Sequence, residues 1–362
     1  MRRLLKAIPF PFWCYFLPMT ARTLGILPEA ASFYQAMVYL LLPAALFLLL
    51  IATQFAPLLK TGRTAFATML AGTSGIVLGG VLSCYLFRQF LPKEAWRGFG
   101  ALAGSWTGGS INMASLKEAV GTPHELFSPM ILVDSVIAYS WMAFLLFLVP
   151  YQNTFDRWVG AKQSLHQTLE ETLNALSPKK GTAVLTFQRG GALLGTAAAG
   201  TALCFWLSRF LPVWEGVLTQ QSWVVLLATT LAMLLALTPI SRLESWGASR
   251  LGTLLLYLIL LAMGAQADLK DLLRFPLFIV VGACWILIHG ALLFCFGKCF
   301  RIPLVLLATA SQANVGGIVS APIVASCYKK HLGPLGLLLA LFGNAVGTYL
   351  GFLTAHLIRL VL

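Results

Sequence analysis

Long apolar runs separated by short polar turns dominate the chain. Most of these runs are at least ~20 residues long, enough for an α-helix to cross the hydrocarbon core of a bilayer. The eleven runs lie at 6–26, 33–56, 64–91, 98–116, 124–150, 189–211, 221–239, 249–268, 272–297, 303–327 and 331–361. A membrane β-barrel would instead show short segments of alternating polarity. The pattern therefore predicts an all-α polytopic membrane protein with about 9–11 membrane segments.

Composition and charge support this interpretation. The chain is 59% hydrophobic and 10% charged, whereas soluble domains carry about 25% charged residues. The net charge is +13, but the Lys and Arg residues are scattered through short loops. Scattered basic residues are typical of positive-inside anchoring rather than of nucleic-acid binding. We expect a multi-pass protein of the cell (inner) membrane, with the lipid bilayer as its surroundings and no nucleic-acid partner.

One long polar stretch divides the chain. Residues 151–188 contain many charged, amide and hydroxyl side chains and interrupt the succession of apolar runs. They are predicted to form a linker with one amphipathic helix near 163–176. The expected domains are therefore a first membrane repeat over 1–150, the linker over 151–188 and a second membrane repeat over 189–362.

The two halves resemble each other in the order of their segments. Each half has an apolar helix with a polar end, a glycine-containing helix, a glycine-paired segment and a closing helix. The closing helices lie at 133–142 and 342–351, and an offset of 210 residues between them places Asp134 opposite Asn344. Several segments that match in the same order predict a duplicated architecture.

The glycine-paired segments read SWTGGSINMA at 105–114 and SQANVGGIVSA at 311–321. Lipid offers no hydrogen bonds, so non-helical backbone at membrane depth must be covered by protein or line a wet cavity. Two arrangements remain open for these segments. Either each segment is re-entrant, entering and leaving the membrane by the same face, which inverts one repeat relative to the other, or each crosses the membrane as a broken helix. The first places more Lys and Arg inside, as membrane proteins prefer.

Broken helices would present half-helix ends and free backbone groups to a binding site. Serine, threonine, asparagine and glutamine side chains supply neutral oxygens beside each break. The candidate substrate- and ion-binding residues are Ser105, Thr107, Gly108, Gly109, Ser110, Asn112, Asp134, Ser311, Gln312, Asn314, Gly316, Gly317 and Asn344. The alternative is tight helix packing through glycine, with serine and asparagine forming interhelical hydrogen bonds.

Asp134 is the acidic residue placed deepest in an apolar run. An isolated charge at that depth costs roughly 3 kcal/mol or more, so the carboxylate should bind an ion, take up a proton or face water. Oxygen ligands suit a hard cation, which predicts a Na⁺ site formed by Asp134, Asn112 and Asn314. A protonated carboxyl bonded to nearby backbone is the alternative. His289 is expected to be a packed, neutral histidine.

No enzyme motif is present. The sequence contains no HExxH, GxSxG or phosphate-binding GxxxxGK[ST] motif. Their absence argues against an enzyme and against transport powered directly by ATP hydrolysis. No cofactor is expected beyond Na⁺ or H⁺ as a coupling ion.

The segments around these residues resemble a known membrane family. The resemblance lies in the order of GSWTGGSINMASLKEAVG (104–121), DSVIAYSWMAFLLFLVP (134–150), LLYLILLAMGAQADL (255–269), ASQANVGGIVSAPIVAS (310–326) and GNAVGTYLG (343–351). The resemblance is to the family catalogued as domain of unknown function 819 (DUF819), grouped with cation/proton antiporters and anion transporters such as bile-acid/sodium symporters. It implies two inverted repeats, a scaffold domain, a core domain with paired broken or re-entrant helices, and secondary transport.

The sequence therefore predicts a secondary active transporter of a small polar solute or organic anion, coupled to Na⁺ or H⁺, working by alternating access. A cation/proton antiporter with Asp134 as the shuttle is an alternative. A non-transporting membrane scaffold or sensor that signals through 151–188 is an alternative of another class. A homodimer is considered as the quaternary state. Substrate, stoichiometry and the choice between symport and antiport stay open.

Overall fold

The computed structural model describes residues 10–28, 31–51, 63–161, 186–214, 219–270, 276–329 and 332–362. Within these ranges the chain is helical and contains no β-strand. The α-helices are α2 (Phe10–Thr23), α3 (Ala31–Ile51), α5 (Arg63–Phe87), α6 (Ala95–Gly108), α7 (Ser110–Ala119), α8 (His124–Phe147), α9 (Gln152–Val159), α11 (Phe187–Ser208), α12 (Gln220–Ala236), α13 (Ala248–Gly264), α15 (Leu277–Phe300), α16 (Leu304–Val315), α17 (Gly317–Tyr328) and α18 (Gly333–Arg359). Two 3-10 helices are η1 (Val149–Tyr151) and η2 (Pro239–Trp246). Each predicted apolar run thus contains either one α-helix or two short ones.

Six of the described helices are long and apolar enough to cross a membrane, and seven if α12 and η2 form one span bent by 97°. This count is lower than the predicted number of segments because several helices are short. The α2 helix has 14 residues and α13 has 17, and at 1.5 Å per residue neither reaches ~30 Å. Both glycine-paired segments also consist of two short helices.

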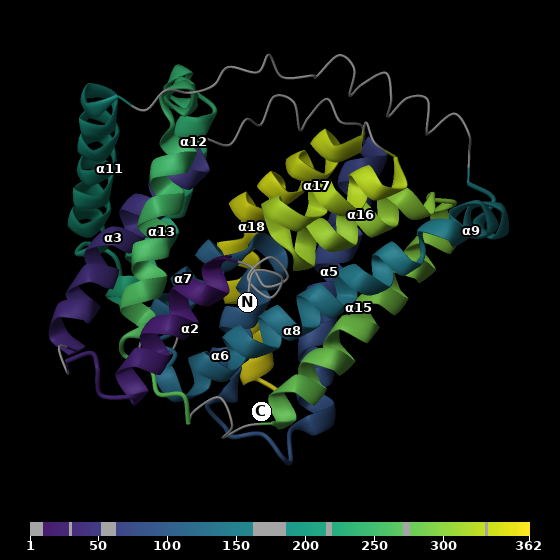
Figure 1. The fold of residues 1–362 in the computed structure, drawn as a ribbon, viewed down its shortest axis with the longest axis horizontal. Coiled ribbons are helices and arrows are strands. Elements are labelled where there is room, and N and C mark those ends of the chain that lie inside the picture. Colours follow the sequence, from purple (N-terminus) through teal and green to yellow (C-terminus); the bar gives the residue numbers. More distant parts are fainter. Residues whose placement is uncertain are drawn as a thin grey trace.

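The helices pack as two bundles (Figure 1). The first bundle consists of α2, α3, α11, α12 and α13, which contact mainly one another. The second bundle consists of α5, α6, α7, α8, α15, α16, α17 and α18. The α7 helix also touches α3 and α12, and α18 touches α12, so these helices join the two bundles.

Small residues allow the helices of the second bundle to approach closely. A Cβ atom on Gly351 of α18 would lie 2.8 Å from the Cα of Gly104 on α6, and one on Gly80 of α5 would lie 2.5 Å from a ring carbon of Trp285 on α15. Small residues at such crossings are the usual means of helix association in lipid, where no hydrophobic force drives helices together. This packing buries α16 and most of α6 and α7, whereas Ile318, Val319 and Ile323 of α17 are exposed.

The same succession of elements occurs in each half. A long helix, two short helices around a glycine pair and a second long helix appear as α5, α6–α7 and α8, and again as α15, α16–α17 and α18. The inverted relation of the halves and the domain bounds stay predictions. The amphipathic helix predicted near 163–176 lies outside the described residues.

Candidate functional site

Both glycine pairs interrupt a helix, as predicted. The α6 helix ends at Gly108 and α7 begins at Ser110, with Gly109 between them at φ +85° and ψ −178°. The α16 helix ends at Val315, and α17 begins at Gly317 with φ +66°. Positive φ is strained for residues with a Cβ atom but open to glycine. The glycines therefore allow each segment to end one helix and start another.

The chain folds back on itself at both breaks. A Cβ atom on Gly104 would lie 3.0 Å from the carbonyl oxygen of Asn112, and the Gln312 Nε2 donates a hydrogen bond to the Ser320 Oγ at 2.8 Å. Residues eight positions apart in a continuous helix are separated by about 12 Å along its axis. Each segment is therefore a helical hairpin, which favours the re-entrant arrangement over a broken crossing helix.

The two hairpin tips touch. A Cβ atom on Gly317 would lie 3.7 Å from the Cα of Gly109. The second halves of both hairpins begin at this contact, so the N-termini of α7 and α17 lie close together. A helix N-terminus carries partial positive charge and N–H groups without intrahelical partners.

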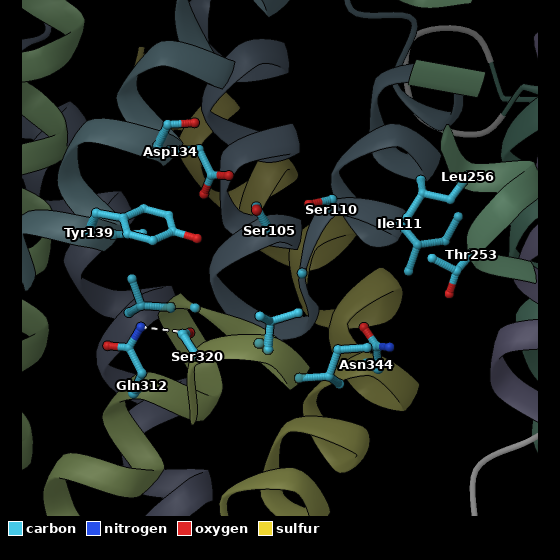
Figure 2. A pocket seen from close by; sticks show the side chains of 18 of the residues that line it. Ser105, Ser110, Ile111, Asp134, Tyr139, Thr253, Leu256, Gln312, Ser320 and Asn344 are labelled. Atoms are coloured by element: carbon cyan, nitrogen blue, oxygen red, sulfur yellow. Dashed lines mark hydrogen bonds between the residues drawn. The ribbon is translucent and has the colours of Figure 1, made fainter. Parts of the chain in front are cut away.

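A cavity of about 320 Å³ adjoins the hairpin tips and lies between the two bundles (Figure 2). The first bundle contributes Leu49 from α3 and Thr253, Leu256 and Tyr257 from α13. The second bundle contributes the remaining walls from both hairpins, α8 and α18. The predicted residues that line the cavity are Ser105, Gly109, Ser110, Asp134, Gln312, Gly316, Gly317 and Asn344. The structure thus gathers residues from both breaks around one space.

Asp134 provides the charge of this cavity. Its Oδ1 accepts a hydrogen bond from the Trp106 Nε1 at 2.9 Å, and the Ser105 side chain also bonds to the carboxylate. Of the described residues that line the cavity, Asp134 is the one Asp, Glu, Lys, Arg or His. The half-buried carboxylate is therefore held by two donors beside a cavity whose walls are largely apolar.

Asn112 and Asn314 do not line the cavity. The Asn112 Oδ1 accepts a hydrogen bond from the Thr348 Oγ1 at 2.5 Å, and the Asn314 Oδ1 accepts one from the Thr73 Oγ1 at 2.8 Å. Both asparagines are fully buried. Their amide oxygens thus tie the hairpins to α18 and α5. The predicted Na⁺ ligand set is not brought together, and the described residues contain no cluster of three or more His, Cys, Asp or Glu suited to a metal.

Thr107, Gly108 and Ser311 also lie outside the cavity lining. The Thr107 Oγ1 donates to the carbonyl oxygen of Ala103 at 2.8 Å. A Cβ atom on Gly108 would lie 2.7 Å from the carbonyl oxygen of Gly343. At these positions the alternative of helix packing describes the structure better than a binding role does.

The Ser311 side chain belongs to a buried network. Its Oγ accepts a hydrogen bond from the Trp141 Nε1 at 2.8 Å and lies 2.8 Å from the His289 Nε2. The His289 Nδ1 lies 3.0 Å from the carbonyl oxygen of Gly72, which can only accept. The hydrogen of neutral His289 is thus assigned to Nδ1, leaving Nε2 to accept from the serine hydroxyl. The buried position agrees with the expected packed histidine, and its neutral charge stays a prediction.

Sequence reasoning missed several lining residues as candidates. Ser135 and Tyr139 follow Asp134 on α8 by one and five residues, and their nearness to the buried carboxylate along the same helix could have indicated them. Thr253, Leu256 and Tyr257 come from the first bundle, and no local signal marks them.

Comparisons with known proteins agree with this membrane architecture. The model of the family described as "Protein of unknown function (DUF819)" matches residues 1–361. The chain is also 27% identical over 346 residues to the "Uncharacterized membrane protein YjcL" of Bacillus subtilis (strain 168), covering 92% of this chain and 86% of that protein. The apolar spans and this relative identify an integral, multi-pass membrane protein. The family match covers nearly every residue, and the chain therefore belongs to the DUF819 family.

Proposed function

We propose that the protein is a secondary active transporter that moves a small polar solute or organic anion by alternating access, coupled to Na⁺ or H⁺. One observation carries the proposal: two hairpin tips meet beside a cavity between the bundles, and Asp134 is the one carboxylate among the described residues that line it. Irregular backbone at membrane depth is tolerated where it lines a wet cavity, and transporters use such helix ends to bind solutes and ions.

The distribution of polar groups around the cavity supports movement of one bundle against the other. Asp134, Gln312 and Ser320 all belong to the second bundle. The opposite wall includes the apolar side chains of Leu49 and Leu256. Thr253 and Tyr257 complete that wall, so a shift of the second bundle would carry its polar groups past a surface of mixed polarity.

Asp134 is the residue proposed to bind the coupling ion. A lone carboxylate in a low-dielectric space is costly while it is charged and uncompensated. Na⁺ or a proton would neutralise it, and the empty and occupied states would then differ in the energy needed to move the second bundle. The proposed coupling ion needs no other acidic residue, since Asp134 is the acidic one lining the cavity.

Uptake into proteoliposomes tests the proposal. Vesicles containing the full chain are given labelled small carboxylates and amino acids with an inward Na⁺ gradient, an inward proton gradient or no gradient. We expect at least one solute to accumulate only when one of the gradients is present. Accumulation that does not depend on either gradient, or that equals that of protein-free vesicles, contradicts the proposal.

A cation/proton antiporter is the second candidate. It is favoured because the part of the cavity lining that the structure describes has no Lys, Arg or His, and a carboxylate without a basic neighbour can exchange a metal ion for a proton. This candidate predicts that adding Na⁺ or Li⁺ moves protons across the vesicle membrane without an organic solute. A pH-sensitive dye inside the vesicles distinguishes it from solute transport.

A further inference from the structure

Two buried hydrogen bonds fasten the first bundle to the second. The Tyr15 hydroxyl of α2 lies 2.9 Å from the Ser128 Oγ of α8. That serine already donates its hydrogen to the carbonyl oxygen of His124, so the tyrosine is the donor. The Ser222 Oγ of α12 donates to the carbonyl oxygen of Ala119, the last residue of α7, at 2.5 Å. Each bond therefore joins helices that belong to different bundles.

A third bond of this kind joins α18 to α12. The Tyr349 hydroxyl lies 2.6 Å from the Thr230 Oγ1, and this threonine donates to the carbonyl oxygen of Leu226 in its own helix at 2.7 Å. The tyrosine is again the donor across the boundary between the bundles. The Gln266 side chain, which follows α13, also bonds to His124 at the start of α8.

The first two bonds lie on the same side of the cavity. On α8, Ser128 precedes the cavity-lining Asp134 by six residues, and on α7, Ala119 follows the cavity-lining Ile111 by eight. At 1.5 Å per residue these offsets are about 9 and 12 Å along the helices. Only four residues separate the end of α7 from the start of α8. Both bonds therefore lie toward the side where α7 ends and α8 begins.

The bond of Tyr349 lies toward the same side. Tyr349 follows the cavity-lining Asn344 by five residues along α18. The C-terminal half of α18 packs beside the first half of α6, because a Cβ atom on Gly100 would lie 2.4 Å from the Cβ of Ala355. The α6 helix begins on the side where α7 ends, since the two form one hairpin. This side, with its bonds between the bundles, is the closed side.

The opposite side of the cavity is less tightly closed. Val319 of α17 lines the cavity and is 69% exposed. The α17 helix contacts mainly α6, α8, α16 and α18 of its own bundle, and η2 contacts mainly helices of the first bundle. The Tyr328 hydroxyl at the end of α17 donates to the carbonyl oxygen of Leu145 on α8 at 2.6 Å, again within one bundle. This side, where α8 ends, is the open side.

From these observations we infer that the bonds of Tyr15, Ser222 and Tyr349 form a gate on the closed side, and that this conformation admits solute from the open side. Opening the gate breaks contacts between the bundles and leaves the packing within each bundle intact. Because each hydrogen bond contributes modestly to stability, a bound solute or ion can shift the balance between the closed and open gate. This inference rests on the proposed transport function and assigns the control of access to the same cavity.

The test measures access to the cavity from each face of the membrane. The full chain carries Ser135→Cys, since Ser135 lines the cavity, and is treated with a permanently charged methanethiosulfonate in spheroplasts and in inverted membrane vesicles. Mass spectrometry reads the modification rate at residue 135 separately from the native cysteines. In separate chains, Thr154→Cys on α9 marks the open side and Lys93→Cys between α5 and α6 marks the closed side, as both residues are exposed.

We expect residue 135 to react at least tenfold faster in the preparation that labels Thr154→Cys than in the one that labels Lys93→Cys. Tyr15→Phe removes one bond of the gate and should raise the slower rate by about two- to tenfold, as for one lost hydrogen bond. Tyr349→Phe should act in the same direction, and its partner Thr230 is exposed, so this variant disturbs the core least.

Tyr328→Phe is the matched control. It also removes the hydroxyl of a buried tyrosine, but that hydroxyl bonds within the second bundle on the open side. The rate from the closed side should therefore stay equal to that of the Ser135→Cys chain. Melting temperatures recorded for every variant show whether a changed rate reflects partial unfolding.

The outcomes separate this inference from the proposed function. Equal reaction of residue 135 from both faces overturns the inference and leaves gradient-driven transport possible. The inference also fails if Tyr15→Phe and Tyr349→Phe leave the slower rate unchanged, or if Tyr328→Phe raises it as much as they do. If the rates change as expected but no solute accumulates in vesicles under any gradient, the gate stands and the proposed function fails.

Discussion

Thr73 on α5 donates a hydrogen bond to the Asn314 Oδ1 on α16 over 2.8 Å, and neither side chain lines the cavity. The bond fixes the second hairpin to a long helix of the same bundle. Thr348 and Asn112 form the corresponding bond between α18 and the first hairpin. The asparagines beside the glycine pairs thus hold the hairpins in place, while other residues of the same hairpins face the cavity.

Thr73→Val tests this anchoring role. Valine has nearly the same shape but no hydroxyl group, so the buried Asn314 Oδ1 loses its donor, which costs about 1–3 kcal/mol. We expect a lower melting temperature in detergent. Thr196→Val on α11 is the control, because that exposed hydroxyl bonds to the carbonyl oxygen of Ala192 in its own helix. Equal melting temperatures for the two variants would show that the Thr73–Asn314 bond does not stabilise the hairpin.

Gly317→Ala tests the backbone at the second hairpin tip. Gly317 has φ +66°, and an L-residue in this region is disfavoured by roughly 1–2 kcal/mol. The added methyl group would also lie 3.7 Å from the Cα of Gly109. We expect loss of stability together with weakened solute binding, measured by thermal unfolding with and without ligand.

Gly191→Ala is the control for that substitution. No described atom lies within 4 Å of a Cβ built at Gly191, and its helix α11 favours alanine over glycine by about 0.5–1 kcal/mol. Stability should therefore stay the same or increase. If Gly317→Ala and Gly191→Ala change the melting temperature equally, the backbone conformation at Gly317 does not disfavour a Cβ atom.

Asp134→Asn tests the coupling site. Asparagine retains an oxygen that can accept from the Trp106 Nε1, so the fold should be preserved. Removal of the charge should abolish the dependence of uptake on Na⁺ and proton gradients, while solute binding is reduced far less. The measurement is uptake into proteoliposomes under each gradient, with the melting temperature recorded beside it. Gradient dependence equal to that of the original chain would exclude Asp134 as the coupling residue.

Leu256→Trp tests whether the solute occupies the space between the bundles. Leu256 lines the cavity from α13, and a larger side chain there would fill part of a space of about 320 Å³. We expect solute binding and uptake to be lost. Leu261→Trp on the same helix is the control, since Leu261 is 38% exposed and does not line the cavity. Undiminished uptake by Leu256→Trp would place the solute path elsewhere.

The elements of the fold could largely be predicted from the sequence. Apolar runs interrupted by polar turns specify helix positions, because unpaired backbone groups in lipid are too costly for other structures. The glycine pairs also predicted the helix breaks, since positive φ at Gly109 and Gly317 depends mainly on the absence of a Cβ atom. These are local properties, which adjacent residues along the chain largely decide.

Tertiary packing decided which residues line the cavity. Successive residues of a helix point about 100° apart, so Gln312 faces the cavity whereas Ser311 and Asn314, from the same turn, face α5, α8 and α15. The sequence identified the hairpins as a source of polar groups, but which face meets a neighbouring helix depends on distant residues such as Thr73. The first-bundle wall around Leu256 and the contact between the two hairpin tips likewise exist only once separate parts of the chain have packed together.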